Sequence, residues 1–224
     1  MGEAIGQSLP IAVGVMVSPM PIVAVVLMLV SARARSNGVA FVLGWVAGIA
    51  AVGSVVLLLV GDAAGADDGA TPVWVGLLKL ALGLGLLFLA VKQWRGRPGS
   101  DVEPVVPKWM AAIETFTPVK AFGLAFLLGG INPKNLLLVV AGATAIANAT
   151  GARGDQFVAL AVFTVVASIG VILPVVLYLV MGDRAAQLLE RMRAWMLANN
   201  AVIMSVLLLV LGTKVVGDAI SVLV

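Results

Sequence analysis

The chain contains no cysteine and no histidine among its 224 residues. This absence excludes disulfide bonds, thiol redox chemistry and metal sites built from thiolates or imidazoles. It also excludes proton relays through histidine. Charged residues are scarce as well, at 11% of the chain, where a typical soluble domain has about 25%. Because 62% of the residues are hydrophobic, we expect an integral membrane protein.

Several function classes are not supported by what the sequence lacks. The net charge is only +3, and no basic stripe interleaves with aromatic residues, so we expect no nucleic-acid partner. No G-x-x-x-x-G-K-[ST] motif for a nucleotide phosphate is present. No histidine, cysteine or pair of carboxylates is available at membrane depth for acid–base catalysis. We therefore expect neither an enzyme nor a metal or other cofactor.

Long apolar runs define the expected fold. A membrane-spanning helix needs roughly 20 apolar residues, and six segments qualify, at about 5–31, 38–60, 73–94, 120–147, 156–181 and 201–222. These runs do not alternate with polar residues as the strands of a membrane barrel do. The N-terminal MGEAIGQSLP has no basic region typical of a cleaved signal peptide, so the first run is expected to remain as a helix. The sequence predicts an all-α protein with six transmembrane helices.

Basic residues are distributed unevenly among the loops. The loops after the first, third and fifth runs, with the adjoining helix ends, carry ten of them: Arg33, Arg35, Lys92, Arg95, Arg97, Lys108, Lys120, Arg184, Arg191 and Arg193. The opposite side carries Arg153 together with acidic residues that include Glu3, Asp62, Asp67, Asp68 and Asp155. Positively charged loops stay in the cytoplasm. We expect a multi-pass protein of the inner (plasma) membrane with both termini outside.

The first and fourth runs are interrupted at corresponding places, by SPMP at 18–21 and by INPKN at 131–135. Each is the first run of a three-helix unit, so the chain reads as two repeats, 1–94 and 120–224, joined by a cytoplasmic linker at 95–119. Because three is odd, the two repeats are inverted relative to each other. Interrupted helices in inverted repeats mark the midplane binding site of a transporter.

The two interruptions contain the candidate substrate-binding residues. Proline lacks a backbone donor and breaks a helix, which leaves N–H groups and a helix dipole that attract an anion. Lys134 adds a full charge near the middle of its run, where a cation costs roughly 3 kcal/mol. A structural lysine bonded to freed carbonyls, or one that titrates during transport, are alternatives. The candidates are Ser18, Pro19, Pro21, Asn132, Pro133, Lys134 and Asn135.

Four further cations are secondary candidates. Lys79 and Lys214 lie about two turns from the outer ends of the third and sixth runs, and we expect them to extend outward to water rather than form an outer polar vestibule. Arg33 and Arg35 could guide an anionic headgroup from the cytoplasmic leaflet, although setting the topology is the simpler role. On the second run, Gly44 and Gly48, with alanines nearby, favour close helix packing.

With SPMP and NPKN in inverted halves, the chain resembles the LysE exporter superfamily. The stretch TPVKAFGLAFLLGGINPKNLL at 117–137 is more closely similar to the GAP or Sap family of sulfolipid- and peptidoglycolipid-addressing proteins. This resemblance implies export of cell-envelope glycolipids or lipid-linked intermediates. It places Pro19, Pro21, Asn132, Pro133 and Lys134 at the family's motif positions.

Three functions remain open from the sequence. The first is a transporter or flippase that exports an anionic lipid or lipid-linked sugar by alternating access. The second is an exporter of a small organic anion or amino acid, and the third is a non-transporting accessory subunit of a lipid-export complex. Membrane lipids are expected partners, and a homodimer is plausible from the glycine- and alanine-rich faces. Lys134 favours a phosphate, sulfate or carboxylate over a cation.

Overall fold

A computed structural model describes residues 1–31, 33–64, 73–97, 112–182 and 184–223. Asp67, Asp68 and Lys108, which enter the orientation argument, lie outside these ranges, and so does the middle of the expected linker. The described part of the chain is all-helical, as predicted. Its elements are α1 (Gly2–Met16), α2 (Pro19–Leu29), α3 (Ala34–Ala64), α4 (Val73–Arg95), η1 (Ala112–Thr115), α6 (Pro118–Phe126), η2 (Leu127–Ile131), α7 (Pro133–Ala149), α8 (Arg153–Met181) and α9 (Arg184–Leu223).

Four helices, α3, α4, α8 and α9, are long and apolar enough to cross a membrane. Two bent pairs qualify when each is taken as one span: α1 with α2, bent by 51°, and α6–η2 with α7, bent by 59°. The described chain thus has four to six candidate spans. Both bends fall where proline interrupts the sequence, at Pro19 and Pro133. The two predicted helix breaks are therefore present.

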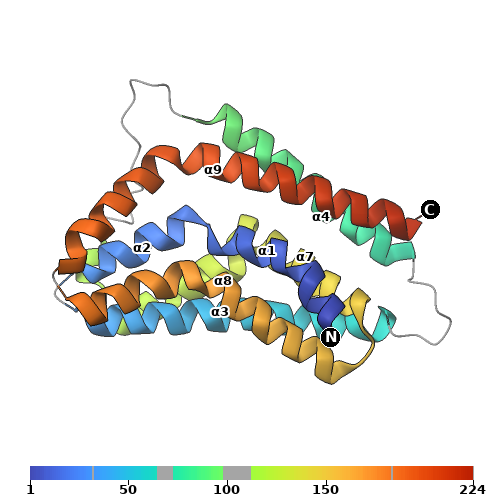
Figure 1. Cartoon of the computed structure of the whole chain (residues 1–224), viewed down its shortest axis with the longest axis horizontal. Helices are drawn as coiled ribbons and strands as arrows, with labels where there is room; N and C mark the ends of the chain where they lie inside the picture. Colours follow the sequence, from blue (N-terminus) through green and yellow to red (C-terminus); the bar gives the residue numbers. More distant parts are fainter. Residues whose placement is uncertain (32, 65–72, 98–111, 183, 224) are drawn as a thin grey trace.

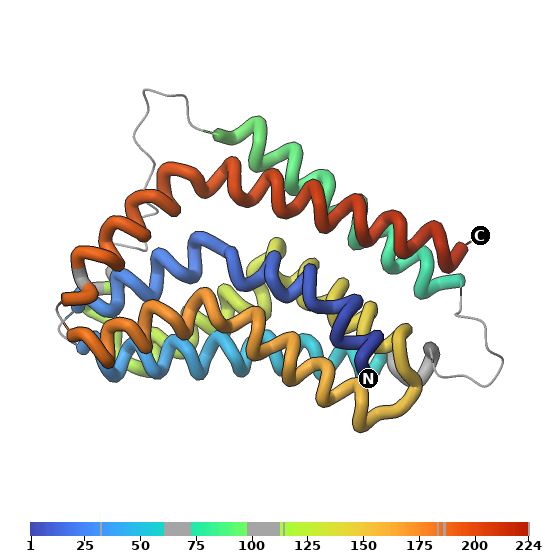
Figure 2. The backbone as a smooth tube through the Cα atoms, in the orientation of Figure 1, coloured from blue at the N-terminus to red at the C-terminus, as the bar shows by residue number. Residues whose placement is uncertain are grey.

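The helices form a main bundle and a separate pair. The bent pairs pack with α3 and α8, whereas α4 packs mainly on α9 (Figure 1). The tube view shows the α4–α9 pair running along one side of the bundle (Figure 2). The N- and C-termini lie at the same end of the molecule (Figure 1). The links from α2 to α3 and from α8 to α9 lie at the opposite end, which is the basic end of the sequence.

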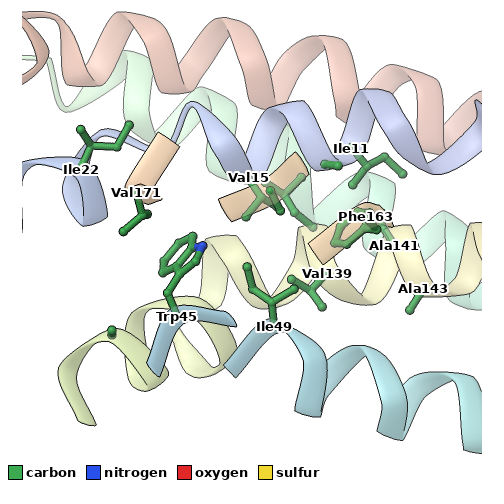
Figure 3. Close-up of a cluster of buried hydrophobic side chains, with 14 of the residues drawn as sticks. Ile11, Val15, Ile22, Trp45, Ile49, Val139, Ala141, Ala143, Phe163 and Val171 are labelled. Atoms are coloured by element: carbon green, nitrogen blue, oxygen red, sulfur yellow. The ribbon is translucent and has the colours of Figure 1, made fainter. Parts of the chain in front are cut away.

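Apolar side chains from α1, α2, α3, α7 and α8 meet in the centre of the main bundle (Figure 3). Ile11, Trp45, Ile49 and Phe163 are fully buried there. Many other large apolar side chains on α3, α4, α8 and α9 are exposed on the surface of the protein. A lipid environment stabilises such a surface, because hydrocarbon contacts hydrocarbon.

Glycine lets α3 approach the second bent helix backbone to backbone. A Cβ atom at Gly44 would overlap the carbonyl oxygen of Phe122 in α6, and one at Gly48 would lie 2.7 Å from the carbonyl oxygen of Phe126. Small residues permit such close contacts between membrane helices. A similar contact supports the first break, since a Cβ at Gly170 of α8 would overlap the carbonyl oxygen of Met16.

The stretch that begins at Arg184 and carries Arg191 and Arg193 is helical. It is the first part of the 40-residue helix α9, and it contains an exposed ion pair between Glu190 and Arg193. Figure 1 shows that α9 bends, so that this first part turns toward the bundle while the remainder runs along α4. Continuous backbone hydrogen bonding through the bend is less costly in a membrane than a broken helix end.

We expect Gly44→Ala to destabilise the protein by about 1–3 kcal/mol, because the new methyl group would push α6 away from α3. Thermal unfolding of the detergent-solubilised protein, followed by size-exclusion chromatography of the remaining folded fraction, measures the effect. Gly123→Ala is the matched control, since a Cβ at Gly123 in α6 meets open space. Alanine has the higher helix propensity, so the control should be neutral or stabilising. Equal melting temperatures for the two variants would contradict the close contact.

Candidate functional site

The first break leaves the hydroxyl group of Ser18 available to another element. Ser18 is the N-cap residue of α2 but makes no capping hydrogen bond. A capping side chain accepts from the second or third N–H of its helix, and the third position here is Pro21, which has none. Ser18 is only 1% exposed. The SPMP sequence therefore places a buried hydroxyl oxygen at the break, and this oxygen accepts no capping hydrogen bond from the backbone.

The second break is built from a wide turn and two asparagines. In η2 the N–H of Asn132 donates to the carbonyl of Leu127 at 2.8 Å, five residues earlier. The side chain of Asn132 caps α7 by accepting from the N–H of Lys134 at 3.2 Å. Asn135, 1% exposed, donates from its side-chain amide to the carbonyl of Leu128 at 2.8 Å. Both asparagine side chains thus satisfy the broken backbone.

Lys134 joins the two breaks. Its ammonium group donates to the Ser18 hydroxyl oxygen at 2.7 Å and to the Met204 sulfur at 2.9 Å. Ser18 lies between α1 and α2, and Met204 lies in α9, so one side chain connects three parts of the fold. An ammonium group has three N–H donors. The third has no protein acceptor in the part of the chain that the structure describes.

The charge on Lys134 is not neutralised by the described residues. Hydroxyl and thioether partners are both neutral, and a thioether is a weak acceptor. The described carboxylates are engaged elsewhere: Glu3 with Gln7, Asp155 with the N-terminal amine, Glu190 with Arg193, and Asp218 with Lys214. A cation at this depth is stabilised by a polar cavity or an anion.

A groove of about 430 Å³ exposes Lys134 to a ligand. We call it the Lys134 groove. Its lining comes from α4 and the residue after it, from the start of α7, and from α9: Leu89, Lys92, Gln93, Gly96, Asn132, Pro133, Lys134 and Leu208. Two lysines line the groove and no acidic residue does. It extends from the second break to the basic end of α4.

The predicted site residues divide between this groove and its surroundings. Asn132, Pro133 and Lys134 line the groove, and Ser18 contacts Lys134. The other three are not lining residues: Pro19, Pro21 and Asn135 are buried within the bundle. Lys92 and Gln93 were not predicted as binding residues, because Lys92 was counted only as a charge that sets topology. Leu89, Lys92, Gln93 and Gly96 follow one another at three- and four-residue intervals, so they share one face at the end of α4. This shared face is the sequence signal that could have identified Lys92 and Gln93.

The secondary candidates lie elsewhere. Arg33, just before α3, and Arg35, the second residue of α3, are exposed and do not line the groove. Lys79 does not extend to water as expected: it is 8% exposed, at a position where the charges of Asp218 and Lys214 act on it. Lys214 pairs with Asp218 one turn along α9 at 2.6 Å. Lys214 and Asp218 are both partly exposed, so only Lys79 departs from the expectation.

The arrangement has the groups needed to bind an anion. Lys134 and Lys92 can each donate to a phosphate, sulfate or carboxylate, and Gln93 can donate a neutral hydrogen bond. No group of histidine, cysteine or carboxylate side chains suited to a metal ion is found among the described residues.

Comparison with known families identifies this chain. The model of the family described as Sap, sulfolipid-1-addressing protein, matches residues 9–221. The match covers nearly the whole chain, so the protein belongs to the Sap family, as the resemblance implied. Neither the curated proteins nor the solved structures contain a match to the chain.

We expect the contact between Lys134 and Ser18 to appear as a coupling energy. Ser18→Ala should cost about 1–3 kcal/mol, because the ammonium group loses its better acceptor. In a Lys134→Met background the same change should cost much less, since no charge then remains to be solvated. Unfolding by titration with sodium dodecyl sulfate measures the four stabilities of this double-mutant cycle.

Ser36→Ala provides the control for the serine substitution. The Ser36 hydroxyl is exposed and donates to the Arg33 carbonyl, so its loss should change stability by less than about 0.5 kcal/mol. Additive effects of Ser18→Ala and Lys134→Met would show that the two breaks are not coupled through this contact.

Proposed function

We propose that this member of the Sap family is an integral membrane transporter that exports an anionic cell-envelope lipid. The observation that carries the proposal is the pair of lysines, Lys134 and Lys92, that line one groove with no acidic residue among its lining residues. The family's name associates it with a sulfolipid. A sulfate or phosphate headgroup supplies the negative charge that this groove lacks, and its several oxygens can accept from both lysines.

The headgroup would be held at the second break and the lipid tails would remain in the bilayer. Lys134 supplies the central contact through its third N–H, and Lys92 supplies the entry contact nearer the basic end. Asn132 and Pro133 form one wall, whereas Ser18 and Asn135 hold the lysine and the broken backbone in place. In this role Pro19 and Pro21 act by freeing the Ser18 hydroxyl.

The architecture supports a transporter of two inverted three-helix repeats, with six spans. In each half, the second helix packs on the broken helix of the other half: α3 on α6, η2 and α7, and α8 on α1 and α2. Each contact includes a glycine close to the backbone of the broken helix, Gly48 in α3 and Gly170 in α8. Corresponding roles at corresponding places are what a duplicated unit produces. The halves are 1–94 and 120–224, joined by 95–119.

The orientation that follows from the basic residues places the open part of the groove toward the cytoplasm. The starts of α3 and α9, where Arg35 and Arg184 lie, are at the end of the molecule opposite both termini (Figure 1). In the inner membrane this end would be cytoplasmic, and the termini would be outside. A lipid made inside the cell would then enter near Lys92 and move to Lys134, as alternating access requires.

A flipping assay in liposomes tests the proposal. Purified protein is reconstituted with a sulfated galactolipid that carries a fluorescent acyl chain, and dithionite then bleaches only the label in the outer leaflet. We expect the protein to accelerate flipping of the sulfated lipid but not of phosphatidylcholine with the same label. Lys134→Gln should slow flipping at least about tenfold, because one charge-assisted hydrogen bond contributes about 1.5–3 kcal/mol.

Lys92→Gln should have a smaller effect, and Lys120→Gln is the matched control. Lys120 is exposed at the start of α6 and does not line the groove. Its substitution therefore removes the same charge without changing the groove. The proposal would be contradicted if Lys134→Gln flipped the sulfated lipid at the wild-type rate. It would also be contradicted if the wild type flipped the sulfated and zwitterionic lipids at equal rates. No flipping by the protein alone would instead favour an accessory subunit.

A further inference from the structure

The α4–α9 pair carries a second groove, on the side opposite the Lys134 groove. Its volume is about 440 Å³, and its lining residues are Ala90, Val91, Trp94, Arg95, Ser205, Val206 and Leu209. We call it the Trp94 groove. The Trp94 groove uses positions 90, 91, 94 and 95 of the α4 region, and the Lys134 groove uses positions 89, 92, 93 and 96. The two sets therefore alternate along the helix. Residues in two such interleaved sets occupy opposite faces of a helix. The two grooves are therefore separate sites.

The walls of the Trp94 groove suit an acyl chain. Val91, Val206 and Leu209 each expose about half of their surface. The Ser205 hydroxyl donates to the Val202 carbonyl at 2.9 Å, so it is already paired. The lining residues other than Ser205, Trp94 and Arg95 are aliphatic. Hydrocarbon fits it without loss of hydrogen bonds.

The end of the groove is positively charged. Arg95 lines it at the last residue of α4, and the guanidinium of Arg97 lies 3.9 Å from the centre of the Trp94 ring. Within the described ranges, neither arginine has an ion-pair partner. Tryptophan and arginine at a helix end are typical of the level of lipid headgroups. An apolar groove that ends at two guanidinium groups matches one phospholipid with an anionic headgroup.

We propose that the Trp94 groove binds an anionic phospholipid, with its phosphate at Arg95 and Arg97 and one acyl chain between α4 and α9. This lipid is not the transported substrate, because its site lies on the other face of the helix pair. It fills the seam of two helices that make few contacts with the main bundle. The proposal does not depend on the proposed transport activity.

Native mass spectrometry of the full-length protein tests the proposal. The protein is exchanged into mixed micelles containing equal amounts of phosphatidylglycerol and phosphatidylcholine, and retained lipids are counted. Wild type should retain one phosphatidylglycerol in preference to phosphatidylcholine. Arg95→Gln should reduce that retention about tenfold, the effect of losing one charge-assisted hydrogen bond. Val206→Trp should reduce it similarly by filling the groove with an indole ring.

Two variants serve as matched controls. Val210→Trp adds the same ring to another exposed valine of α9 that does not line the groove, and Lys120→Gln removes an exposed charge elsewhere. Both should retain the lipid as wild type does. The proposal is overturned if wild type retains both lipids equally or neither, or if Arg95→Gln or Val206→Trp retains the lipid normally. Loss of the lipid in Lys134→Gln alone would place it in the Lys134 groove and would also overturn the proposal.

Discussion

The structure depends on one lysine side chain held where two broken helices meet. Lys134 donates to Ser18 from the first break and to Met204 from α9, and both partners are neutral. A lysine at membrane depth is costly unless polar groups surround it. The first break supplies the Ser18 hydroxyl, and α9 supplies the Met204 sulfur. The same charge that joins the elements remains able to attract an anion, so the structural and ligand-binding roles of Lys134 are not exclusive.

Broken helices in a membrane have to be supported by their neighbours. The asparagines of the second break satisfy the backbone locally, through the N–H of Lys134 and the carbonyl of Leu128. Glycines in α3 and α8 then bring a straight helix against each broken one at backbone distance. Close packing of this kind contributes van der Waals contact where the hydrophobic effect contributes little. The backbone next to each break is therefore held against a neighbouring helix.

The α4–α9 pair relates differently to the bundle. Its two helices contact each other far more than they contact anything else. One face of the pair completes the Lys134 groove, with Lys92 and Leu208, and the other face forms the Trp94 groove. At the same end of α4, Lys92 lines the Lys134 groove and Arg95 lines the Trp94 groove. A change in the position of this pair would alter the Lys134 groove directly, because Met204 and Lys92 belong to the pair and Lys134 belongs to the bundle.

The sequence alone determined the class of protein, the helices and the breaks, because these follow from local composition: apolar runs, prolines and the distribution of charge. It also singled out Lys134, since a lone charge in an apolar run is visible without a fold, and the motif around it indicated the Sap family. Only the tertiary structure decided the partners. Ser18 lies 116 residues from Lys134 along the chain and Met204 lies 70 residues away, and the burial of Lys79 depends on α9. Lys92 lines the same groove as Lys134 only because α4 packs beside α7. Such pairings follow from the packing of whole helices, which residue type and spacing within one helix do not specify.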